Sequence, residues 1–567
     1  MNLRSFLSIL AAGAIALLVL GVVGFSKLTA QSPVSLLRGG KLLNPSGVVF
    51  VPKQAPVMAS LLVNPDRLEA FRQWATTPGN RRRSRQELTQ IKQNLLANTG
   101  LDYARDLKPW LGEEITLVVT SLDFDRDRQN GPQPGYLLIA TTKNAARSRE
   151  FLQQFWQKQT NQSTDLAYEQ FKGVNLIYNN QPLKAKSTQS GGYYTRKKTK
   201  PQLPKLATAV VGDRFVLFAN SVKVLRDAIN NVQAIDLGLS NTPSYQQSLE
   251  RLTAPRIGLT YFNLPELSAW IAKKPAPETD QPNKILTVGL SVNRQGLEAE
   301  NALLISAEDS EPSLKEPVEA LQYVPSESAL AAAGTDLNAF WTQLQGSTED
   351  SQVAVFGQWV AQAVDQLQSQ WGMNLPDDIF SWVRGEYAIA LLPIADREPD
   401  WVFVAEKTNE STAAIAHLDT VAKEKGFSVG NLTLGGQQIT VWTNLVATAN
   451  KRLETEVKGV HGTVGNYEIF TRSVEAMDEA LQGRDRSLLK NDKFKEAIAT
   501  LPQPNNGYLY ADWKPFQPII EQQFPLIRVA EVAMKPFFES LRSLTFSSYG
   551  SQTGIQRSQV FFQLGQS

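Results

Sequence analysis

Three aspartates in the stretch DFDRDRQNGPQP have the spacing with which a calcium-binding loop begins. Asp123, Asp125 and Asp127 place carboxylates at alternate positions, and Ca²⁺ prefers oxygen ligands of this kind. The rest of the stretch departs from such a loop, because Arg128 occupies the position of the required glycine and Pro134 that of the bidentate glutamate. The aspartates are a calcium candidate, but the stretch is more simply a solvated hairpin loop. No cofactor is expected.

Other residues with catalytic chemistry are scarce. The absence of cysteine excludes thiolate metal sites and cysteine nucleophiles, and neither His417 nor His461 has a triad pattern around it. Glu113 and Glu114 are adjacent acids, but neighbours in a strand point to opposite faces and cannot share a substrate. Nucleotide-binding glycine motifs are missing as well. We therefore expect a protein that is not an enzyme. The alternative is a carboxylate-based hydrolase or carbohydrate-active enzyme whose acids converge from distant segments.

Two basic clusters could meet a partner. Their cations would attract anionic lipid headgroups or an acidic protein, although a solvated surface loop is the commoner outcome. The chain's formal net charge of only +2 disfavours a nucleic-acid partner. The candidate contact residues are Arg81, Arg82, Arg83 and Arg85 in the first cluster, and Arg196, Lys197 and Lys198 in the second.

An apolar segment lies close to the amino terminus. Residues 6–25 contain no charge and, as a helix, would span ~30 Å, the thickness of the hydrocarbon core of a bilayer. This length favours an uncleaved membrane anchor over a secretory signal peptide, for which cleavage after Ala30 is the alternative. Residues 1–30 are thus an anchor or signal segment and residues 31–42 a stalk, and the bulk of the chain is expected to be exported.

The order of elements after the stalk occurs twice. DLKPWLGEEITLVV around Trp110 returns as DIFSWVRGEYAIALL around Trp382, 272 positions later. Each is followed by a second strand, a helix, further strands and a helix that opens at Ser221 or Ser473. Large aromatics at matching points of a repeat are usually core anchors, the alternative being the lining of a ligand groove. Residues 185–203 form an insertion in the first copy.

Antiparallel hairpins mixed with helices, without regular strand–helix alternation, predict an α+β fold. We expect two tandem copies of one mixed domain after the transmembrane helix. Their predicted boundaries are 43–308 for the first copy, 309–315 for a polar linker and 316–566 for the second copy.

The apolar segment, the two tryptophan segments and VVGDRFVLFANSVKVLRDAI together resemble the domain of unknown function 3352 family, membrane-anchored proteins common in cyanobacteria. The second copy departs from the pattern by placing Arg384 between Val383 and Gly385. The resemblance covers most of the chain after the anchor. It implies a membrane-tethered protein of the thylakoid lumen or periplasm, of unassigned biochemistry, and it brings no catalytic residues.

The sequence therefore predicts a membrane-tethered extracytoplasmic binding or scaffold protein. Its expected partners are the membrane, through residues 6–25, and a protein or lipid. A role in the assembly or maintenance of membrane complexes follows only from the setting of the family. No nucleotide or nucleic acid is expected to bind.

Overall fold

The computed structural model describes residues 43–67, 101–127, 129, 131–160, 166–179, 206–272, 284–304, 314–339, 341–342, 368, 374–394, 399–447, 453–483, 486–523 and 535–565. Among these residues, no helix has the length and apolar character needed to cross a membrane. The predicted anchor at 6–25, the insertion at 185–203 and most of the linker at 309–315 lie outside the described residues.

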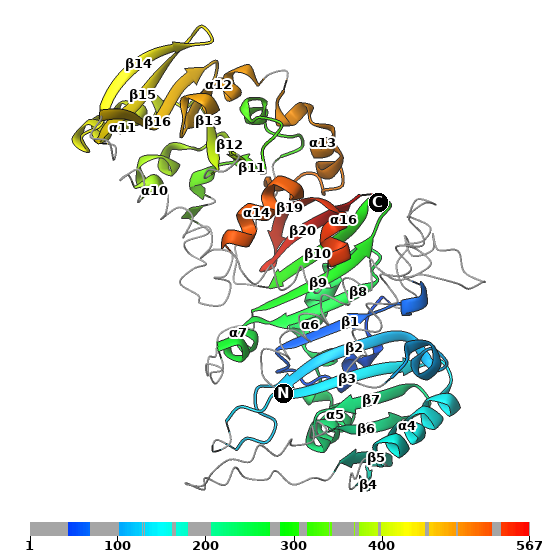
Figure 1. The fold of residues 1–567 in the computed structure, drawn as a ribbon. Helices are drawn as coiled ribbons and strands as arrows, with labels where there is room; N and C mark the ends of the chain where they lie inside the picture. Colours follow the sequence, from blue (N-terminus) through cyan, green and yellow to red (C-terminus); the bar gives the residue numbers. More distant parts are fainter. Residues whose placement is uncertain are drawn as a thin grey trace, which may run out of the picture.

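The described strands form one 20-stranded sheet in which every neighbouring pair is antiparallel. Figure 1 shows it running from β4 at the lower end to β14 at the upper end. The strands of residues 57–304 are β1 Val57–Leu61, β2 Leu111–Ser121, β3 Gly135–Thr142, β4 Leu166–Phe171, β5 Val174–Asn179, β6 Ala207–Val211, β7 Phe215–Ala219, β8 Gly258–Asn263, β9 Ile285–Val292 and β10 Gly296–Leu304.

The remaining strands belong to the second half of the chain. They are β11 Leu330–Thr335, β12 Glu386–Leu392, β13 Asp400–Glu406, β14 Ser428–Leu434, β15 Gln437–Ala447, β16 Leu453–Val464, β17 Tyr467–Thr471, β18 Tyr508–Asp512, β19 Leu541–Gln552 and β20 Ile555–Leu564.

The strand order has a simple symmetry. From one edge the pairings run β4-β5-β6-β7-β3-β2-β1-β8-β9-β10, and the order continues β20-β19-β18-β11-β12-β13-β17-β16-β15-β14 to the other edge. The second series repeats the first in reverse, so the halves meet at the β10–β20 pair, which we call the seam. The predicted mixture of helices with an antiparallel sheet is confirmed.

Helices cover both faces of the sheet. Those of one face are α5 Val222–Gln233, α6 Pro243–Glu250, α12 Val474–Gln482 and α13 Asp492–Ile498, whose apolar residues share cores with the strands. Those of the other face are α4 Ala145–Thr160, α7 Leu264–Ala272, α10 Leu375–Asp378, α11 Ser411–Glu424, α14 Trp513–Gln523 and α16 Lys535–Ser540. Because strand side chains alternate between faces, Met58 and its neighbour Ala59 belong to different cores.

Both repeated tryptophans are core side chains. Trp110 is 2% exposed and Trp382 3%, which agrees with the packing-anchor interpretation. Each indole nitrogen donates a hydrogen bond to the carbonyl four residues earlier, at Asp106 in the first half and Asp378 in the second. This bond satisfies the one polar group of a buried indole. The predicted helix caps are confirmed too, since the Ser221 and Ser473 side chains accept from backbone N–H groups of α5 and α12.

Candidate functional site

The three candidate calcium ligands lie in the β2–β3 loop and bond to the loop itself. Asp123 accepts from the backbone N–H of Gln133, and Asp125 accepts from that of Asp127. Burial, offset in part by that backbone hydrogen bond and reinforced by neighbouring Asp125, raises the pKa of Asp123. Within the described residues no group of three potential ligands is placed to hold a metal ion. Both predicted basic clusters, residues 81–85 and 196–198, lie outside the described part of the chain.

The adjacent acids of β2 have different surroundings. Glu113 is partly exposed and forms an ion pair with Arg67, with 3.4 Å between Oε2 and Nη1. Glu114 has no exposed surface and accepts hydrogen bonds at 2.7 Å from the backbone N–H groups of Ser46 and Gly47. A Cβ at Gly47 would lie 2.9 Å from Glu114 Oε1, so glycine permits this approach. The prediction that these two carboxylates do not share a site is confirmed.

A corresponding acid occupies β12. Glu386 accepts from the backbone N–H of Ala320 and from the hydroxyl of Tyr467. Glu114 and Glu386 each hold the segment that precedes the first strand of their half, η2 Ser46–Phe50 and η6 Glu319–Tyr323. These carboxylates therefore organise the fold and are occupied by local donors.

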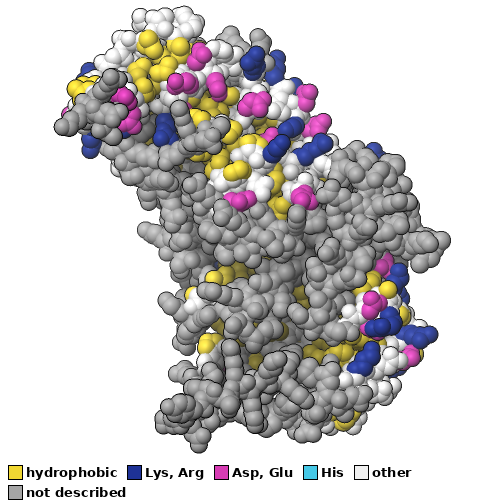
Figure 2. Space-filling view, viewed as in Figure 1, with side chains coloured by type: hydrophobic (Ala, Val, Ile, Leu, Met, Phe, Trp, Pro, Cys, Tyr) yellow, Lys and Arg dark blue, Asp and Glu magenta, His cyan; other side chains and the backbone are white. Residues whose placement is uncertain are grey.

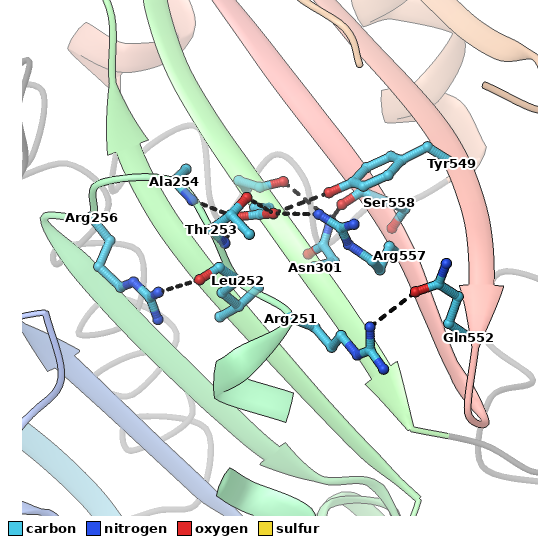
Figure 3. Close-up of polar contacts among 12 residues, drawn as sticks. Arg251, Leu252, Thr253, Ala254, Arg256, Asn301, Tyr549, Gln552, Arg557 and Ser558 are labelled. Atoms are coloured by element: carbon cyan, nitrogen blue, oxygen red, sulfur yellow. Dashed lines mark hydrogen bonds and ion pairs between the residues drawn. The ribbon is translucent and has the colours of Figure 1, made fainter. Parts of the chain in front are cut away.

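The seam contains a third buried acid, Glu300 on β10, which is 5% exposed. Its Oε2 accepts from the backbone N–H groups of Thr253 and Ala254 at 2.8 and 3.0 Å. Its Oε1 lies 3.3 Å from both the Tyr549 hydroxyl and Arg557 Nη2. Figure 3 shows these donors converging from the loop after α6 and from the last two strands. The Glu300 carboxylate thereby links the two halves.

Further side chains make contacts across the seam. Arg557 lies over the Tyr549 ring, 4.7 Å from its centroid. Burial, together with the charge of Glu300, raises the pKa of Tyr549, so its hydroxyl stays a donor. Nearby, Arg251 donates to Gln552 Oε1 at 3.0 Å across the same junction. These side-chain contacts therefore add to the backbone pairing of β10 with β20 in joining the two halves.

Of the two histidines, His417 is exposed, with its Nε2 3.9 Å from Asp378 Oδ1, and His461 makes a buried contact in the second half. His461 on β16 is 5% exposed, and its Nε2 lies 2.9 Å from Asp419 Oδ1 on α11. Trp442 Nε1 donates to the same oxygen at 2.7 Å. Burial raises the pKa of Asp419, but the hydrogen bonds from His461 and Trp442 outweigh it and leave that pKa below its usual value. In the first half, Thr208 stands at the register position of His461 and accepts from Trp156.

This contact predicts a pH dependence of stability. A carboxyl whose folded pKa is depressed stabilises the fold above its unfolded pKa, about 3.9, and this contribution is lost as pH falls through the folded value. We expect Asp419→Asn to lower the urea midpoint at neutral pH and the difference from wild type to shrink below about pH 4. Urea titrations of both proteins at several pH values measure it. A difference that stays constant at the lowest pH would contradict the assignment.

Three exposed leucines lie on β14, β15 and β16 at the upper end of the sheet. Beyond Thr443, β15 and β16 continue past β14 as a two-stranded arm, residues 444–447 and 453–456. Leu445 and Leu453 are 63% and 70% exposed on one face of this arm, and Leu432 of β14 is 45% exposed on the same side. At this end Figure 2 shows hydrophobic side chains among uncharged and charged ones. Strand alternation alone could not show that these leucines are exposed.

Comparisons with known proteins give a family but no activity. The family described as "Protein of unknown function (DUF3352)" matches residues 10–564. No curated protein matches the chain. Among solved structures, crystal form I of TP0453 is similar over 47% of this chain and 81% of that chain, with 9% identity and a TM-score of 0.23.

Proposed function

Because this chain belongs to the DUF3352 family of proteins of unknown function, which confirms the resemblance of the sequence but assigns no chemistry, we propose a function from the protein's own surfaces. It is a membrane-tethered extracytoplasmic binding or scaffold protein, held to the membrane by residues 6–25. Its body presents a docking surface to a protein partner. The bulk of the chain lies on the exported side of the membrane.

The observation that carries the proposal is the exposure of two leucines on the arm. Leu445 and Leu453 expose most of their surface on one face, whereas full burial of a leucine side chain stabilises a complex by about 1.5–3 kcal/mol. Exposed apolar side chains gathered at one end of a molecule are typical of interaction sites. Between Lys425 and Lys451 the sequence has no charged residue, so docking on β14 and β15 desolvates no charge of those two strands.

Charge on the other face of the arm favours a protein over an anionic lipid surface. Glu454 and Glu456 lie opposite Val446 and Asn444, on the face away from the two leucines. Glu456 forms an ion pair with Lys458, with 2.8 Å between Oε2 and Nζ, whereas the carboxylate of Glu454 would be repelled by anionic headgroups. A protein can place a cation beside this carboxylate while it covers the leucines.

The matched strand orders support the finer architectural inference. The halves are two copies of one α+β domain. Corresponding positions have diverged, as where Thr208 in one half stands for His461 in the other. The buried acids Glu114 and Glu300 are already occupied by hydrogen-bond donors of the fold, which favours binding over the hydrolase alternative.

The test is a pull-down of the tagged full-length chain from detergent-solubilised membranes. We expect the double substitution Leu445→Ser and Leu453→Ser to reduce partner recovery at least about tenfold, because each leucine contributes more than about 1.4 kcal/mol when buried. Quantitative mass spectrometry measures recovery.

The matched control is Leu237→Ser, which changes a leucine that is 46% exposed in the first half. Its recovery is expected to equal that of wild type. Equal recovery with the arm variant and wild type would refute the arm as the docking surface, and recovery of lipid alone would favour a membrane in its place.

A further inference from the structure

We propose that the edge of β14 that no described strand occupies is a self-association site, at which β14 of a second copy of this chain adds as an antiparallel strand. The site differs from the arm face, because the contacts are made by backbone groups in the plane of the sheet. Its occupant is a strand, since unpaired N–H and C=O groups in a row are recognised by another strand.

β14 has a pairing strand on one side only. Its 7 residues pair with β15 without a register shift, and no other described strand pairs with it. Most of its side chains are exposed on both faces of the sheet. A flat edge of this kind is normally protected by a charge, a proline or a bulge, and SVGNLTL contains none of these.

The opposite edge of the sheet is protected. Glu169 on β4 accepts from Arg226 Nε at 2.9 Å, and α5 thereby supplies a cation beside that strand. Burial of Glu169 opposes this effect, but the hydrogen bond from Arg226 is the larger influence and lowers its pKa. Pairing at β4 would have to desolvate an ion pair, whereas pairing at β14 would not.

The hairpin geometry fixes which groups of β14 are available. Leu434 and Gln437 flank the two-residue turn Gly435–Gly436, where both glycines have positive φ. In such a hairpin the flanking pair exchanges its hydrogen bonds, so every second residue from Leu434 points its backbone groups toward β15. The backbone groups of the intervening residues, Val429, Asn431 and Thr433, then point outward.

A two-fold axis at Asn431 uses all of these groups. Asn431 then pairs with its own copy, and Val429 pairs with Thr433 of the other chain, so each outward residue exchanges both hydrogen bonds. In this register Leu432 lies beside Gly430 of the other chain. A Cβ at Gly430 would have no atom within 4 Å, which leaves room for the incoming leucine.

The seam shows this mode of joining within a single chain. β10 and β20 are the last strands of their halves, and they pair antiparallel from Gly296–Gln563 to Leu304–Ile555. The same kind of edge-to-edge contact at β14 closes a pair of chains about a two-fold axis and leaves β4 as the outer edge.

The test uses the absence of cysteine from the natural chain. Paired residues that exchange hydrogen bonds have Cα atoms about 5.5 Å apart, within the range that a disulfide spans. We expect Asn431→Cys, in the full-length chain in detergent, to form a covalent dimer under mild oxidation. Thr433→Cys alone should not do so, but it should cross-link to Val429→Cys when the two are mixed.

The control is Tyr168→Cys on β4, at a side chain that is 72% exposed. Cross-linking of Asn431→Cys no faster than that of Tyr168→Cys would overturn the proposal. A cysteine-free check is Leu432→Lys, which sets like charges near the axis and should weaken self-association at least about tenfold in light scattering, with thermal unfolding unchanged. A wild-type chain that remains monomeric at every accessible concentration would also overturn it.

Discussion

Replacing Glu114 with alanine should lower the free energy of unfolding by about 3–5 kcal/mol. The substitution strands the backbone N–H groups of Ser46 and Gly47 in a region where Glu114 has no exposed surface, and it leaves a cavity beside β2. Each buried donor without a partner costs about 1–3 kcal/mol. Urea unfolding followed by tryptophan fluorescence measures the change.

The matched control is the adjacent residue. Glu113→Ala removes a partly exposed ion pair with Arg67, and such pairs contribute about 0.2–1 kcal/mol. The two glutamates differ by one position in sequence, so composition and local propensity are nearly the same. Equal effects of the two substitutions would show that the contacts of Glu114 with residues 46 and 47 do not stabilise the fold.

Replacing Glu300 with alanine should cost about 3–4 kcal/mol and should act on the junction between the halves. It removes the acceptor for Thr253 and Ala254 and leaves Arg557 beside Tyr549 without its carboxylate. Chemical denaturation gives the total loss. Hydrogen exchange of β10 and β20 amides locates it, because the seam should open before either half unfolds.

Two milder substitutions calibrate this result. Tyr549→Phe removes one donor to Glu300 and should cost about 1 kcal/mol. Gln552→Ala removes an exposed contact with Arg251 at the same junction and should change stability by less than about 0.5 kcal/mol. If the backbone amides of the seam exchange no faster in Glu300→Ala than in Gln552→Ala, Glu300 does not hold the two halves together.

Local features of the fold were accessible from the sequence because they depend on neighbouring residues. Ser221 and Ser473 precede amphipathic segments and cap the expected helices. Each tryptophan indole donates a hydrogen bond to a carbonyl only four residues earlier. The same short segment therefore gives both side chains the same surroundings. The opposite placement of Glu113 and Glu114 follows from strand alternation alone.

Long-range features had no such signal. Glu300 is one acid among many in the sequence, and its donors lie 47 residues before it and 257 after it. No residue of β10 or its sequence neighbours indicates that the second edge of β10 pairs with β20. This pairing joins the strands of both halves into one sheet. Leu445 and Leu453 alternate as core residues of a strand do, and their exposure depends on whether a helix covers that end.

The seam also determines when, during synthesis of the chain, the two halves can pair. Arg557 and the Glu300 it contacts are 257 residues apart, so one edge of β10 lacks its β20 partner until those further residues have been made. At about 5–20 residues per second, synthesis of that stretch takes roughly 13–50 s. The first half must therefore persist through that interval without β20 beside β10.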